Sequence, residues 1–151
     1  RPLPELRCKW PNDLLLQRRK VAGLLLELAP KRGQVVLGMG VNLVLMDVVD
    51  AVYPVGSLAE FSIAPQELAL NVCVAFARWL ETWRMMGFAP LRRAWLERAH
   101  GLGEVATVRL VNEEFEGTFK GLSADGALLL DQGGEGVKSV SAGEVFFGVG
   151  V

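Results

Sequence analysis

The hydrophobic pattern of the chain changes near residue 101. Before that point, long apolar segments alternate with short polar turns, and two segments repeat their apolar residues with a helical period. After it the helical period disappears, and 11 of the 17 glycines occur there. Turns at residues 112–114, 124–126 and 132–134, the last two containing glycine, separate short stretches typical of strands, at residues 105–111, 115–120, 127–131 and 136–140. We predict two domains, residues 1–101 and residues 102–151, and the second is a small β-barrel.

The most unusual part of the first domain runs from residue 7 to residue 27. An extended apolar run is broken by the sequence K-W-P-N-D, because Pro11 fixes its own φ and the Asn-Asp pair favours a turn. The apolar pattern then resumes, turns once at a Q-R-R sequence and continues. This pattern predicts a loop followed by a β-hairpin. Lys9, Asp13 and Lys20 are expected at one end of the resulting sheet.

Residues 34–45 are β-branched and apolar, which predicts a buried strand. The strand contains Gly38 and Gly40, and glycine weakens a strand unless something approaches its backbone closely. A β-bulge and a flat wall against a ligand ring are the two interpretations. Residues 46–63 show no sustained period and are expected to be a loop with one short helical turn at residues 57–61.

Two helices are predicted, at residues 65–86 and 90–100. Proline suits the first helical position at residue 65, and a glycine follows each helix. An aromatic stripe along the first helix is expected in the core: Phe76, Trp79 and Trp83. His100 is the only histidine and is expected to be a surface or helix-end residue, since one histidine does not form a metal site. The fold class is therefore α+β, with a mixed β-sheet packed with helices before the barrel.

Composition excludes several classes of function. The chain has 151 residues and a formal charge of −1 from 16 basic and 17 acidic residues, which argues against binding to nucleic acid or an anionic membrane. No apolar run approaches the length of about 20 residues that spans a membrane. Cys8 and Cys73 lack the spacing of a metal or redox motif, so we expect two free core thiols in the reducing cytoplasm.

Three blocks of sequence resemble the biotin protein ligases, also called biotin–[acetyl-CoA-carboxylase] ligases. The first block is K-W-P-N-D followed by R-K-V-A-G and Glu27, and the second is G-M-G-V-N at residues 38–42. A weaker third block comprises G-A-L-L-L-D at residues 126–131 and G-E-V at residues 143–145. The order and spacing of the blocks cover essentially the whole chain. The resemblance implies the C-terminal part of a biotin/lipoate ligase-like catalytic domain and an SH3-like C-terminal domain.

The charged residues of the first block suit the chemistry that this resemblance implies. Activation of a carboxylate by ATP brings two anions together, so fixed positive charge is needed near the forming bond. Lys9 and Lys20 supply such charge, and Asp13 is suited to orient an attacking lysine amine or to accept its proton. Charges at strand ends are also commonly solvated or paired, so residue chemistry alone leaves both interpretations open.

The resemblance implies a role for each matching position. Lys20 and Asp13 are expected to be catalytic, with Lys20 contacting the biotin carboxylate and the adenylate phosphate. The expected wall against biotin consists of Gly23, Leu25, Gly38 and Gly40. Lys9, Asn12 and Asn42 are expected at the nucleotide, with Asn42 holding adenine. Biotin and ATP with Mg²⁺ are the implied ligands. The implied partner is the biotin carboxyl carrier domain of acetyl-CoA carboxylase, and a homodimer of this protein is a further expectation.

The sequence departs from the family pattern in two ways. It contains no G-R-G-R loop, which closes over biotinyl-adenylate in family members, and no arginine follows its last predicted strand. We therefore expect residues 1–151 alone not to biotinylate a carboxylase domain. A non-catalytic half-ligase that binds a partner and a relative of lipoate ligase are the alternative functions. No helix-turn-helix is predicted, so a repressor role is not expected.

Overall fold

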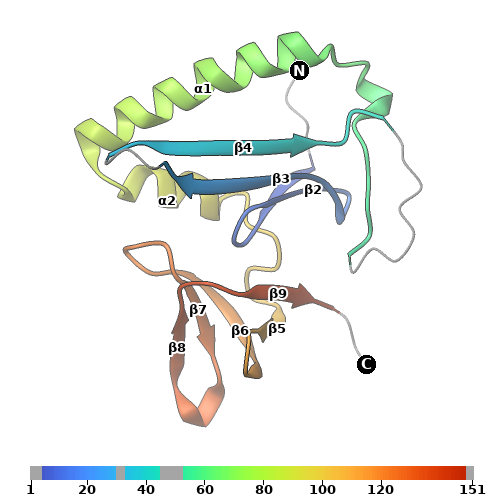
Figure 1. The fold of residues 1–151 in the computed structure, drawn as a ribbon. Helices are drawn as coiled ribbons and strands as arrows, with labels where there is room; N and C mark the ends of the chain where they lie inside the picture. Colours follow the sequence, from blue (N-terminus) through green and yellow to red (C-terminus); the bar gives the residue numbers. More distant parts are fainter. Residues whose placement is uncertain (1–4, 30–32, 45–52, 149–151) are drawn as a thin grey trace. The chain divides into compact units, whose positions relative to one another are not determined.

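The computed structural model of the chain describes residues 5–29, 33–44 and 53–148. The elements follow the order β1 to β4, the 3-10 helix η1, helices α1 and α2, and then β5 to β9, with a second 3-10 helix η2 between β7 and β8 (Figure 1). The chain divides into two compact units, residues 1–74 and residues 75–151, with the division inside α1. Each unit contains its own antiparallel sheet.

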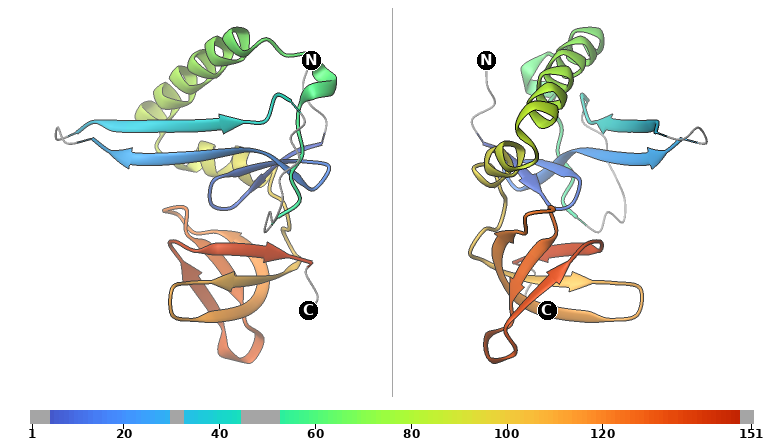
Figure 2. Two further views of the ribbon diagram at one scale, coloured as in Figure 1. Left: turned by 45° about the vertical axis from the view of Figure 1, so that its right-hand side comes forward. Right: turned by 90° about the vertical axis from the view of Figure 1, so that its left-hand side faces the viewer.

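The sheet of the first unit has the order β1-β2-β3-β4, and all of its paired strands are antiparallel. Its strands are β1 (Leu6–Lys9), β2 (Asp13–Leu16), β3 (Arg19–Leu28) and β4 (Val35–Val41). The predicted loop and hairpin are therefore confirmed. The long strands β3 and β4 extend well beyond β1 and β2 (Figure 2). A single parallel bridge between Lys20 and Val55 adds the segment that precedes η1 (Ala59–Phe61).

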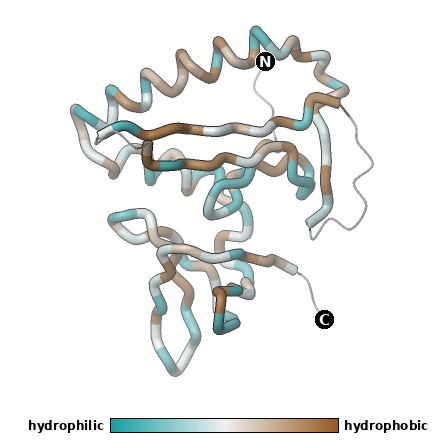
Figure 3. The backbone as a smooth tube through the Cα atoms, viewed as in Figure 1, coloured by the Kyte–Doolittle hydropathy of each residue, from teal (hydrophilic) through white to brown (hydrophobic). Residues whose placement is uncertain are grey.

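The described core of the first unit is small. Leu16, Val21 and Leu58 are buried together, and partly buried side chains surround them: Leu6, Leu14, Val41, Leu43 and Ile63. The prediction of a buried strand at residues 34–45 is wrong for the described residues. The strand ends at Val41, Val35 and Val36 are more than half exposed, and residue 45 lies outside the described residues. Few side chains of this unit cover the hydrophobic stretches of β3 and β4 (Figure 3), because its core cluster lies near the other end of the sheet.

Helix α1 (Pro65–Met86) has the predicted bounds. Pro65 occupies the start, and Gly87 follows the end with a φ of +73°, which glycine adopts without a steric penalty. The aromatic stripe is nevertheless not core: Trp83 is 53% exposed and no residue of α1 is buried. Helical periodicity identifies an apolar face but does not supply the element that covers it. Cys73, also expected in the core, is exposed on this helix, whereas Cys8 is partly buried, and both thiols are free.

Helix α2 (Ala89–Leu96) ends four residues earlier than predicted. The residues after it turn and bring His100 against Phe147, with the ring centroids 5.1 Å apart and edge to face. His100 is only 6% exposed, so its predicted surface position is wrong. Gly101 explains the close packing, because a Cβ at this position would lie 2.2 Å from the ring of Phe147. A sequence pattern does not reveal such a contact, since the two residues are far apart in the chain.

The sheet of the second unit has the order β8-β7-β6-β5-β9. Its five antiparallel strands are β5 (Val105–Arg109), β6 (Glu114–Leu122), β7 (Leu128–Asp131), β8 (Val137–Val140) and β9 (Glu144–Phe147). Val108, Phe119 and Leu130 are fully buried, and Trp95 of α2 packs edge-on against Phe119. The α+β class and the small SH3-like β domain are confirmed. No helix among the described residues is long and apolar enough to cross a membrane.

Candidate active site

Four of the predicted site residues form one row across the first sheet. Lys9 of β1 is paired with Asp13 of β2, Asp13 with Gly23 of β3, and Gly23 with Gly40 of β4. Directly paired residues of antiparallel strands project from the same face, and so do residues two positions apart. Leu25 and its partner Gly38 therefore share this face. The strand register thus gathers six predicted site residues on one surface.

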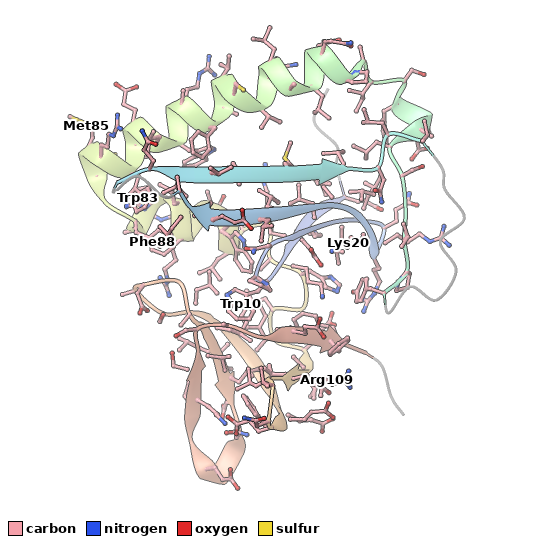
Figure 4. All side chains as sticks on the ribbon, in the orientation of Figure 1. Trp10, Lys20, Trp83, Met85, Phe88 and Arg109 are labelled. Carbon is pink, nitrogen blue, oxygen red and sulfur yellow. The ribbon has the colours of Figure 1, made fainter. Side chains whose placement is uncertain are left out.

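Lys20, labelled in Figure 4, reaches the same surface because β3 contains an irregularity. Lys20 and Gly23 are three positions apart, so a regular strand would direct their side chains to opposite faces. The register instead shifts between Leu14, which pairs with Ala22, and Leu15, which pairs with Lys20. Leu15 is two positions from Asp13, and its partner Lys20 is therefore on the face of Asp13. This is the way in which a β-bulge redirects a side chain.

The turn before Lys20 is conformationally strained. Gln17 and Arg18 have φ values of +50° and +62°, in the left-handed region that asparagine and glycine favour. A two-residue hairpin loop needs positive φ at both central positions when it forms a type I′ turn. The side chains at this turn are therefore poorly matched to its backbone. Strain of this kind is common beside functional sites.

Asp13 is the carboxylate between two lysines. Lys20 Nζ lies 2.7 Å from Asp13 Oδ1, with the side chains 39% and 20% exposed, and Lys9 Nζ lies 3.9 Å from Oδ2. Lys9 is only 7% exposed and its ammonium lies 4.5 Å from the centre of the Tyr53 ring. A cation over an aromatic face is electrostatically favourable. Sequence reasoning missed Tyr53, because it lies in a stretch without periodicity or a motif.

Gly23 makes room for the pair of charges. A Cβ at this position would lie 3.3 Å from Lys20 Cε and 3.4 Å from both Lys20 Nζ and Asp13 Oδ1. These separations are shorter than comfortable carbon contacts, so a side chain at position 23 would press on both charged groups. Gly23 thus permits the Lys20 side chain to cross β3 toward Asp13.

Gly38 and Gly40, the other two glycines of this surface, have no charged side chain close to them as Gly23 does. A Cβ at Gly40 would meet nothing within 4 Å, and one at Gly38 would make only ordinary contacts with Leu25. Leu25 is 58% exposed. The face therefore combines charge at one end with an open, flat apolar strip at the other. The bulge interpretation of Gly38 and Gly40 fails, because the register of β3 with β4 is regular from Ala22 to Leu28.

The two asparagines have different surroundings. Asn12 is exposed in the turn after β1, and its carbonyl accepts a hydrogen bond from the Leu24 amide, at 2.9 Å. Asn42 follows β4, and its Nδ2 donates to the carbonyls of Gly56, at 2.9 Å, and Lys20, at 3.3 Å. The Asn42 side chain is therefore bonded to the backbone of Lys20 and of its neighbour in space, Gly56. Sequence reasoning also missed Gly56, which had no motif to identify it.

The arrangement is suited to binding an anion beside an apolar ring or chain. The two lysines and Asp13 together carry one net positive charge, and an ammonium has three N–H donors. A Lys20 amine that donates to Asp13 can thus donate to an anion as well. In the described part of the chain, no group of three or more His, Cys, Asp or Glu residues is placed to hold a metal ion.

Two family models match the chain, and they cover both ends of it. Residues 4–42 match the biotin/lipoate A/B protein ligase family, and residues 101–148 match the biotin protein ligase C-terminal domain. The first match contains the whole row from Lys9 to Gly40 and all four strands of the first sheet. The second contains all five strands of the second sheet.

Curated relatives match nearly the full chain. The chain is 41% identical to a biotin–[acetyl-CoA-carboxylase] ligase of Paracoccus denitrificans, over 97% of this chain and 65% of the relative. It is 32% identical to the bifunctional ligase/repressor BirA of Escherichia coli, over 93% of this chain and 46% of the relative. The chain thus spans about half to two thirds of the length of these relatives.

Solved structures agree with the sequence matches. A biotin protein ligase of Aquifex aeolicus in complex with biotin and ATP superimposes with a TM-score of 0.78 at 25% identity, over 94% of this chain and 61% of that chain. The apo structure of the Aquifex ligase gives a TM-score of 0.79 over the same share of this chain and 64% of its own. Together, the two matched segments, the curated relatives and the shared fold show that this chain belongs to the biotin protein ligase family.

Proposed function

We propose that this chain carries part of the active site of an ATP-dependent biotin protein ligase. In the first step, a carboxylate oxygen of biotin attacks the α-phosphorus of ATP, which forms biotinyl-5′-adenylate and releases pyrophosphate. In the second step, a lysine amine of a biotin carboxyl carrier domain attacks the activated carbonyl. An amide bond forms, AMP leaves, and the amine loses a proton. Mg²⁺ enters with ATP as part of the substrate complex.

The observation that carries the proposal is the Lys20–Asp13 ion pair beside a flat glycine-lined strip. Lys20 is positioned to stabilise the negative charge that builds up where the carboxylate meets the phosphate. Asp13 is positioned to orient the incoming amine and to accept its proton once the adenylate has formed. The strip formed by Gly23, Gly38 and Gly40 with Leu25 offers an apolar face to the rings and chain of biotin.

Lys9, Asn12 and Asn42 are assigned to the nucleotide in this proposal, in line with the family resemblance. Lys9 acts on the nucleotide mainly through the positive potential of the site, because its ammonium is buried between Tyr53 and Asp13. Residues 1–101 are proposed as the catalytic part and residues 102–151 as the SH3-like domain. The match of the C-terminal family model to residues 101–148 supports this boundary.

The match to the biotin-specific C-terminal model favours biotin over lipoate as the substrate. The Aquifex relative whose structure contains biotin and ATP supports the same choice. Biotin and lipoate are both carboxylic acids with an apolar tail, so the activation chemistry alone does not separate them. Competition between the two acids in an exchange assay tests the assignment, and lipoate should fail to displace biotin.

The proposal is tested by Lys20→Ala in a ligase of the full family length that contains this chain. Loss of one preorganised electrostatic contact typically lowers a rate by about 10²–10³-fold. We expect that loss in the biotin-dependent exchange of pyrophosphate with ATP. Lys120→Ala is the matched control, because Lys120 is a half-exposed lysine of the second unit paired only loosely with Asp131, at 3.7 Å. A Lys20→Ala rate within about threefold of the parent would remove Lys20 from the mechanism.

A further inference from the structure

The backbone of Lys20 is held from the side opposite β2. Its amide donates to the Pro54 carbonyl at 2.8 Å, and its carbonyl accepts from the Gly56 amide at 2.9 Å. These two bonds form the isolated parallel bridge between Lys20 and Val55. The segment from residue 54 to residue 56 therefore acts as a short strand beside the irregular start of β3.

The Asn42 carboxamide joins that segment to Lys20. Its Nδ2 donates to both the Gly56 carbonyl and the Lys20 carbonyl, so both amide hydrogens have backbone acceptors. The backbone of Asn42 adds two more bonds: its amide donates to Val21, at 2.8 Å, and its carbonyl accepts from Leu58, at 2.7 Å. One residue thus ties the start of β3 to the segment that contains Gly56.

Gly56 allows the segment to approach closely enough for these bonds. A Cβ at position 56 would lie 2.8 Å from the Arg19 Cβ and 3.3 Å from Val21 Cγ1. Real Cβ atoms essentially never lie as close as 2.8 Å to another carbon, so a side chain at position 56 would force the segment away from β3. The contacts of Gly56 and the carboxamide of Asn42 therefore serve the same local structure.

This local structure is needed because the register shift interrupts the ladder at Lys20. A bulge disrupts local pairing and bends the strand, and an unsupported bulge can relax toward regular pairing. Regular pairing would direct the Lys20 side chain to the face opposite Asp13. Support from the Asn42 side prevents that relaxation.

We infer that Asn42 is a positioning residue for Lys20: its carboxamide holds the irregular start of β3 in the conformation that points the Lys20 amine at Asp13. This function is additional to the nucleotide contact assigned above. The kinetic part of the inference rests on the proposed function, whereas its structural part concerns the protein without any ligand.

The structural test uses the ligand-free chain and two substitutions, Asn42→Ala and Asn42→Asp. The second keeps the shape of the side chain but replaces the N–H donors with oxygen next to two carbonyls. We expect hydrogen exchange at the Gly56 amide to become about tenfold faster in both variants. The Lys20 ammonium signal in ¹⁵N NMR should lose the protection that its ion pair provides. Asn71→Asp on the exposed surface of α1 is the matched control and should change neither observation.

The inference is overturned if the Lys20 signal stays protected in Asn42→Asp while the Gly56 amide opens. It is also overturned if neither amide exchange nor the Lys20 signal changes in either variant. If Asn42→Ala unfolds the first unit, Asn42→Asp alone decides.

The kinetic test compares the same variants in the full-length ligase. A positioning role lowers kcat for adenylate formation, in addition to any rise in the KM for ATP that loss of the nucleotide contact causes. A pure nucleotide contact raises the KM for ATP and leaves the Lys20 signal intact, which would refute the inference. If the parent protein forms no adenylate, the proposed function fails, and the ligand-free measurements still decide the role of Asn42.

Discussion

Gly23→Ala should separate the stability of this protein from its activity. The φ of Gly23 lies outside the left-handed region, so alanine can adopt this backbone without strain. Replacing glycine by alanine at such a site commonly stabilises a protein by about 0.4–1 kcal/mol, because the unfolded chain loses freedom. The same methyl group would lie 3.3 Å from Lys20 Cε and 3.4 Å from Asp13 Oδ1. The two charged groups must therefore shift by a few tenths of an ångström.

A shift of that size matters for a reaction that depends on alignment. Misplacement of a reacting group by about 1 Å can lower a rate by about 10²-fold, so we expect a loss of about tenfold for the smaller shift. The melting temperature should stay equal to the parent value or rise. Pyrophosphate exchange and thermal unfolding, measured on the same preparation, test both parts of the expectation.

Gly40→Ala is the matched control, since Gly40 is the cross-strand partner of Gly23 and a Cβ there meets nothing within 4 Å. It should bring a similar gain in stability and leave the Lys20–Asp13 pair in place. Its kinetic effect should fall on the KM for biotin, because the methyl group enters the strip assigned to the ligand. The reasoning is refuted if Gly23→Ala retains a rate within threefold of the parent, or if Gly40→Ala lowers kcat as much.

Two further substitutions test the local structure. Replacing Gln17 by Asn together with Arg18 by Gly should raise the unfolding free energy of the first unit by about 1–2 kcal/mol, because both positions have positive φ. Urea titration followed by circular dichroism measures this free energy. An unchanged midpoint would show that the turn is not strained. In the second unit, Arg92 donates from Nε and Nη2 to the Leu122 carbonyl, so Arg92→Leu should cost about 1–2 kcal/mol by the same assay. The exposed neighbour Arg93→Leu is its control, and equal effects of the two changes would contradict the assignment.

Local patterns in the sequence were sufficient for most of the elements. Proline at residue 65 and glycine at residue 87 mark both ends of α1, and turns that contain glycine separate β6, β7, β8 and β9. These features depend on the backbone preferences of a few adjacent residues. Burial was predicted less well, because it depends on which distant element covers a face. Trp83 and His100 show both kinds of error, one exposed and one buried.

The site residues came mainly from the family resemblance, and strand register explains why so many lie on one face. Lys9, Asp13, Gly23 and Gly40 are spread over 32 positions of sequence, yet each pair is in direct register. Register between strands is set by the turns and by the apolar pattern together, and neither signal alone identifies the row. Tyr53 and Gly56 were missed for the same reason, since only folding brings them beside Lys9 and Lys20.

The position of Lys20 shows how a local irregularity can be necessary for a site. The alternation of a strand places residues 20 and 23 on opposite faces, and the chemistry needs them on the same face. The structure resolves this conflict by skipping one position in the pairing of β2 with β3. The skipped position must then be supported from outside the hairpin, which explains why Asn42 and the segment at Gly56 bind the backbone there. An irregular strand, a strained turn before it and a side-chain amide behind it are thus parts of one arrangement, whose result is an ammonium group 2.7 Å from a carboxylate beside the glycine-lined strip.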